Sequence, residues 1–100
     1  MLEDGVSVQA FETVREALAQ LEYYPVRPAL LVADITASDH PAADVDSLAN
    51  RADLIPIWII ASHASSVTGS LDGRGFERVL FRPVDLGKLV EEIRQRIRGQ

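Results

Sequence analysis

The sequence contains no cysteine among its 100 residues. Disulfide bonds and thiolate metal sites are therefore excluded. A chain without disulfides is most simply explained by a reducing cytoplasm, which is the localisation we expect.

Long apolar runs are also absent. None approaches the ~20 residues of a transmembrane helix, and the N-terminus lacks the basic segment followed by an apolar one that would mark an export signal. We therefore expect no membrane association. With 47% hydrophobic residues, the chain can form one compact domain that buries roughly two thirds of its unfolded surface. We expect a single domain over residues 1–100.

Positive charge is scarce, because 10 lysines and arginines face 15 acids and the net charge is -5. Residues 1–50 carry nine acids and two arginines (-7), whereas residues 51–100 carry eight bases and six acids (+2). The C-terminal arginines are explained by the dipole of a helix ending there. Because basic residues do not alternate with the aromatic ones, Trp58 is interpreted as a packing residue, and we expect no nucleic-acid partner.

The hydrophobic pattern alternates between strands and helices. We expect an edge strand at 6–10, two strands buried on both faces at 29–33 and 55–60, and a short strand at 79–81. We expect helices at about 14–22, 42–49, 65–71 and 86–97, with glycines interrupting the third. Thr13 with Glu16, and Asp85, are capping signals for the first and last helices. The pattern predicts an α/β fold with four βα units and a four-stranded parallel sheet.

Three apolar runs end in a polar residue where a strand would give way to a loop. These residues are Asp34, Ser62 and Arg82. The C-terminal ends of parallel strands lie side by side, along the edge at which such folds bind ligands, so we expect the three side chains to share one site. An aspartate, a hydroxyl and a cation at one edge suggest phosphoryl chemistry.

The order and spacing of these segments resemble the receiver domain of bacterial two-component response regulators, without its first strand and first helix. The matching motifs are Leu-Glu-Asp-Gly at 2–5, Leu-Leu-Val-Ala-Asp-Ile at 30–35, Ile-Pro-Ile-Trp-Ile-Ile at 55–60 and Arg-Pro-Val-Asp at 82–85. The resemblance implies a flavodoxin-like α/β/α fold of three layers. It also implies a non-enzymatic role in phosphorelay signal transduction, with a histidine kinase or another signalling protein as partner.

The resemblance also implies roles for individual residues. Receiver domains hold Mg²⁺ with an acidic pair and the phospho-accepting aspartate, contact the phosphoryl group with a hydroxyl on the fourth strand, and neutralise it with a lysine on the fifth. Asp34 matches the phospho-acceptor, which is also a metal ligand. Ala61 occupies the hydroxyl position with Ser62 beside it, and Arg82 occupies the lysine position. Thr36 lies in the loop after Asp34, where the family has Met-Pro and a glycine.

Several positions depart from the family pattern. The acidic pair is missing, because Glu3 and Asp4 precede their strand and so belong to the opposite end of the sheet. One carboxylate is an incomplete site for Mg²⁺, so we expect no cofactor, with Mg²⁺ as the one ion left open. Ser62 would point away from the face of Ala61, and the guanidinium of Arg82 differs from an ammonium in reach and geometry. We expect phosphorylation to be slow or absent.

Interpretations without phosphoryl chemistry also remain open. Asp34 could cap the following turn, and Arg82 could pair with it and fill the site. His40 and His63, together with Asp34 and Asp39, could instead be metal ligands, since both histidines fall in loops at the same edge.

These observations lead to two functional predictions of different class. The first is a degenerate pseudo-receiver that keeps the fold and acts as a protein-interaction module. The alternative is a phosphorylatable receiver whose first strand, with the acidic pair, is absent from this sequence. A third, weaker option is a binding domain for an anionic ligand at the Asp34/Arg82 edge. Without the first strand and helix, the helix from Leu86 would cover one sheet face alone. We therefore expect a homodimer through that face, a swapped or complementing segment, or a chain that is part of a longer product.

Overall fold

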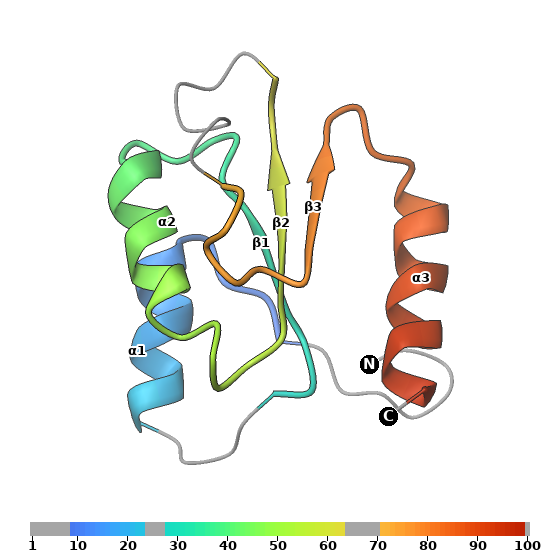
Figure 1. Cartoon of the computed structure of the whole chain (residues 1–100), viewed down its shortest axis with the longest axis horizontal. Helices are drawn as coiled ribbons and strands as arrows, with labels where there is room; N and C mark the ends of the chain where they lie inside the picture. The colour runs from blue at the N-terminus through green and yellow to red at the C-terminus, as the bar shows by residue number, and fades with distance from the viewer. Residues whose placement is uncertain (1–8, 24–27, 64–70, 100) are drawn as a thin grey trace.

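A computed structural model describes residues 9–23, 28–63 and 71–99. The described elements are the helices α1 (Val14–Tyr23), α2 (Pro41–Ala49) and α3 (Leu86–Arg98), and the strands β1 (Leu31–Asp34), β2 (Ile57–Ala61) and β3 (Arg78–Phe81). The strands form one parallel sheet in the order β1-β2-β3. Helices α1 and α2 lie on one side of this sheet and α3 lies on the other (Figure 1). The predicted α/β fold with a parallel sheet is therefore confirmed.

The element boundaries agree with the sequence pattern to within two residues. Pro56 lies just before β2, where its missing amide hydrogen does not interrupt the ladder, and its carbonyl accepts a bond of 2.9 Å from the Leu31 amide. The described part of the sheet has three strands. The predicted strand at 6–10 lies outside the described residues except for Gln9 and Ala10, which are not in a strand. The predicted helix at 65–71 also lies outside them, except for Leu71, which is buried and not helical.

Local side-chain bonds set where two of the helices begin. The Thr13 hydroxyl accepts a hydrogen bond of 3.1 Å from the Glu16 amide at the start of α1, and the Asp85 carboxylate accepts one of 3.0 Å from the Lys88 amide at the start of α3. Each bond satisfies an amide that has no partner within its helix. Helix α2 begins instead with Pro41, whose ring fits the first helical position. Within the described residues, no helix is long and apolar enough to cross a membrane.

The main core lies between the sheet and the helices α1 and α2. All five residues of β2 are buried, because the strand is central and both of its faces are covered. Side chains at alternate positions point to the α1/α2 side, where they join a cluster of ten buried residues. This cluster consists of Leu18, Ala33, Ile35, Val45, Leu48, Ile55, Ile57, Ile59, Ala61 and Leu71.

The opposite face of the sheet has a smaller core. Its buried residues, among those described, are Trp58, Ile60 and Leu89. Five further apolar residues pack against them and are only partly buried; they are Leu30, Val32, Leu80, Val84 and Ile93. Helix α3 is the one described helix on this face (Figure 1). The two faces of the sheet are therefore covered unequally.

We expect Leu48→Ala to lower the free energy of unfolding by about 2–5 kcal/mol, because it leaves a cavity in the main core. Leu48 is fully buried, whereas Leu54 lies a few residues further on and is 56% exposed. Leu54→Ala is the matched control and should change stability by less than about 0.5 kcal/mol. Urea denaturation followed by circular dichroism measures both. Equal effects of the two substitutions would show that the assignment of the core is wrong.

Candidate functional site

The three described strands end at the same edge of the sheet. Asp34 is the last residue of β1 and is in register with Ile60 of β2, while Ala61 is in register with Phe81 at the end of β3. Arg82 follows β3 directly, and its amide donates a bond of 2.9 Å to the Ala61 carbonyl. The parallel pairing therefore brings Asp34 and Arg82 to one rim, although 48 positions separate them in the sequence.

Asp34, Thr36 and Arg82 form a hydrogen-bonded cluster at this rim. Thr36 donates to Asp34 Oδ1 twice, from its amide at 2.9 Å and from its hydroxyl at 2.6 Å. Arg82 forms an ion pair with Asp34 Oδ2 through Nη2, and its Nε donates to the Thr36 hydroxyl at 3.1 Å. Both carboxylate oxygens of Asp34 are thus engaged. The Asp34–Thr36–Arg82 cluster forms a closed set of charge-assisted bonds.

The Asp-x-Thr spacing explains why the loop after β1 turns in this way. An aspartate commonly accepts a bond from the backbone two residues further on, and this Asx turn gives the chain an early exit from the strand. Ile35 is still anchored to the sheet, because its amide donates to the Ile60 carbonyl at 2.9 Å. The turn therefore holds Thr36 directly over the end of the strand, between the carboxylate and the guanidinium.

The electrostatics of the cluster favour an ionised Asp34. Burial by itself would raise the pKa of Asp34, but the bonds from the hydroxyl and amide of Thr36 and the guanidinium of Arg82 outweigh it. The net effect is that the pKa of Asp34 lies below its ordinary value. The side chains of Asp34 and Arg82 remain 33% and 53% exposed, so water still reaches the pair.

The donor set at this rim does not fit Mg²⁺. That ion is usually held by one or two carboxylates together with waters and substrate oxygens in octahedral geometry. Here the single carboxylate already accepts three hydrogen bonds and faces a guanidinium, whose charge repels a cation. Among the described residues, no three histidines, aspartates or glutamates lie close enough together to hold a metal ion.

The other residues predicted for the site occupy different surroundings. Ala61 is fully buried in the main core and has no hydroxyl to offer a phosphoryl group. Ser62 follows β2 at the same end and is half-buried. The His63 ring stacks on Phe81 with centroids 4.1 Å apart, and the His40 amide donates to the Ser38 hydroxyl at 3.0 Å. The His63 ring is therefore packed against β3, whereas the contact of His40 is made by its backbone.

Thr36 has a larger part in the site than its sequence position indicated. It was expected only as a loop residue, yet it bridges the carboxylate and the guanidinium. The signal that could have identified it is a threonine two residues after a strand-end aspartate, which favours an Asx turn.

Comparison with solved structures identifies this architecture. A response regulator receiver protein from Burkholderia phymatum superposes with a TM-score of 0.68 at 16% identity, over 94% of this chain and 77% of that one. The signal receiver domain of a Luxo repressor protein from Vibrio parahaemolyticus gives 0.62 at 23% identity, over 88% and 68%. The chain has the fold of a response-regulator receiver domain.

A third solved structure matches over a small part of its own length. NtrX from Brucella abortus gives a TM-score of 0.67 at 18% identity, and the match covers 97% of this chain but 22% of that one. No family model matches the sequence, and no curated protein is detectably similar to it. The similarity to receiver domains is therefore one of backbone fold, at sequence identities of 16–23%.

We expect the pKa of Asp34 to lie below the ordinary value of about 3.9 and to rise toward it in Arg82→Ala. Titration of the side-chain carboxyl by ¹³C NMR measures this directly. Arg15→Ala is the control. It removes an exposed arginine of α1, outside the cluster, and should leave the titration midpoint of the Asp34 carboxyl unchanged. A wild-type midpoint at or above 3.9 would contradict the cluster.

The same shift predicts how stability depends on pH. The pKa of Asp34 is lower in the folded chain than in the unfolded one, so its ionised carboxylate stabilises the fold at pH values above the pKa of the unfolded chain. This stabilisation is lost as the pH falls through the pKa of Asp34 in the folded chain. Asp34→Asn should therefore lower the melting temperature at pH 7, and the difference from the wild type should narrow below about pH 4. A difference that stays constant from pH 7 to pH 2.5 would argue against this role of Asp34.

Proposed function

We propose that this chain is a receiver-like signalling module that acts as a protein-interaction domain without being phosphorylated. In this proposal Arg82, at the position where an ordinary receiver has a lysine, keeps Asp34 in a standing ion pair. The single observation that carries the proposal is the closed Asp34–Thr36–Arg82 cluster, in which both carboxylate oxygens are already bonded. The receiver fold of the similar structures supports the signalling class.

The geometry of the cluster disfavours phosphoryl transfer for two reasons. An attacking carboxylate oxygen must approach phosphorus, but here each oxygen would first have to give up its bonds to Thr36 or Arg82. Catalysis of phosphoryl transfer also depends on cations that bridge the phosphate oxygens, and the donor set does not fit Mg²⁺. The anion-binding option is disfavoured by the same contact, because the charge of Arg82 is balanced by Asp34.

The proposal and the phosphorylation-competent alternative predict opposite results in one assay. Incubation with acetyl phosphate and Mg²⁺, followed by intact-protein mass spectrometry, should give no phosphoryl mass increment on the wild-type chain. An ordinary receiver domain in the same mixture serves as the positive control. An increment that disappears in Asp34→Asn would replace the proposal by the alternative, a working receiver that accepts phosphate from a histidine kinase.

We also propose that a second copy of this chain, or a complementing segment, covers the less protected face of the sheet. Leu30 lies just before β1, the strand farthest from β3, and Val32 lies within it. Both residues are only partly buried on the face that α3 covers. Partly exposed apolar side chains at the edge of a sheet favour association with another protein surface.

For the second copy, light scattering after size exclusion should give twice the monomer mass at high concentration. Val32→Asp should shift this equilibrium toward the monomer, and circular dichroism shows whether the variant is still folded. Leu54→Asp places the same charge at an exposed position outside this face and is the control. A wild-type chain that stays monomeric at millimolar concentration would exclude the second copy, and the complementing segment would then be the remaining occupant of this face.

A further inference from the structure

An exposed turn at Asp72 and Gly73 begins the segment that leads into β3. Gly73 has a φ of +77°, and a Cβ placed on it would have nothing within 4 Å, so open space surrounds this glycine. Glycine adopts a positive φ at no steric cost. The carboxylate of Asp72 has no hydrogen bond or ion pair with any residue that the structure describes. The turn therefore places a free carboxylate next to the amide of a residue without a side chain.

Each of the other described aspartates lacks one or both of these properties. The carboxylates of four of them accept hydrogen bonds; these are Asp34, Asp44, Asp46 and Asp85. Asp39 and Asp53 are exposed and have no side-chain bond to a described residue, but histidine and leucine follow them. A side chain on the following residue crowds the amide between the two, whereas glycine leaves that amide open. Among the described residues, Asp72 alone has a free carboxylate before a glycine.

We propose that Asp72 is a site of spontaneous isomerisation to isoaspartate in the folded chain. The Gly73 nitrogen attacks Cγ of Asp72, so that an N–Cγ bond forms and a Cγ–O bond breaks. The oxygen leaves as water, with the amide hydrogen and one proton from solvent, and a succinimide ring remains. Water then adds to the backbone carbonyl carbon of Asp72 and breaks its bond to the nitrogen, so the main chain continues through the former side chain. The reaction needs no partner and no phosphoryl group, and so it does not depend on the proposed function.

The product lengthens the main chain by one methylene group at a turn whose two ends are fixed. Leu71, on one side, is 3% exposed and belongs to the main core. On the other side, Arg74 forms an ion pair with Asp46 of α2, beside which this segment passes (Figure 1). A Cβ on Gly75 would lie 3.3 Å from that of Ala52, so the backbone is close there too. The added methylene has to displace one of these contacts, and we expect the isomerised chain to melt at a lower temperature.

The test is incubation of the folded chain at neutral pH, followed by trypsin digestion and electron-transfer mass spectrometry, which distinguishes isoaspartate from aspartate. The tryptic peptide 52–74 contains both Asp53 and Asp72, so the two sites are compared in one molecule. We expect isoaspartate to form at Asp72 at least about ten-fold faster than at Asp53, because leucine follows Asp53. Asp4 also precedes a glycine and is analysed separately, in the peptide 1–15. A rate at Asp72 no greater than that at Asp53 would overturn the site.

A free peptide with the sequence of residues 68–76 gives the rate in the absence of the fold. Because the turn is exposed, we expect Asp72 in the folded chain to isomerise no more than about five-fold more slowly than in this peptide. A stronger suppression would show that the native turn prevents the attack, and would also overturn the proposal.

Asp72→Glu is the matched variant, because it keeps the charge at an exposed position and would need a six-membered ring, which forms less readily. It should form no isomerised product at position 72, and its melting temperature should be the same before and after incubation. The wild-type chain should melt at a lower temperature after incubation than before. An equal decrease in both chains would show that the loss of stability does not arise at Asp72, and no decrease in either would contradict the predicted strain on Leu71 and Arg74.

Discussion

The burial of β2 on both faces is the constraint on which the rest of this structure depends. A strand whose five residues are all buried has to lie in the middle of the sheet, with helices on both sides. Its two neighbours then pair with it in parallel, so their C-terminal ends meet at one rim. The contact between Asp34 and Arg82 follows from that pairing, because each residue stands at or just after the end of a flanking strand.

At that rim a guanidinium pairs with the carboxylate that ends β1. A guanidinium stays charged at all accessible pH values, and its planar fork suits a carboxylate. Thr36 is bonded to both partners and so links them. Under the proposed function, the surface that this domain presents would not depend on phosphorylation.

Much of the fold could be predicted from the sequence, because apolar periodicity reports burial directly. The runs at 29–33 and 55–60 identify buried strands, and the caps at Thr13 and Asp85 identify helix starts. The shared rim was also predictable from parallel pairing. The bridging role of Thr36 was not predicted, since it depends on the exact turn after β1.

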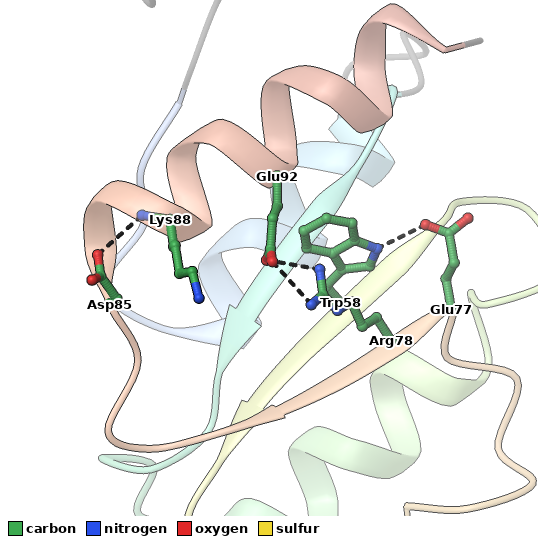
Figure 2. A network of polar contacts seen from close by, with 6 residues as sticks. All are labelled: Trp58, Glu77, Arg78, Asp85, Lys88 and Glu92. Atoms are coloured by element: carbon green, nitrogen blue, oxygen red, sulfur yellow. Dashed lines mark hydrogen bonds and ion pairs between the residues drawn. The ribbon is translucent and has the colours of Figure 1, made fainter.

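The unequal cores on the two faces of the sheet have a consequence for the order in which the chain opens. Ten buried residues join the sheet to α1 and α2, whereas three belong to the α3 side, among those described. Two half-exposed ion pairs of modest strength also hold α3: Arg78 of β3 pairs with Glu92 (Figure 2), and Glu77, just before β3, pairs with Arg96. Subglobal unfolding would thus release α3 first, with its amides exchanging their hydrogens ahead of those in β2.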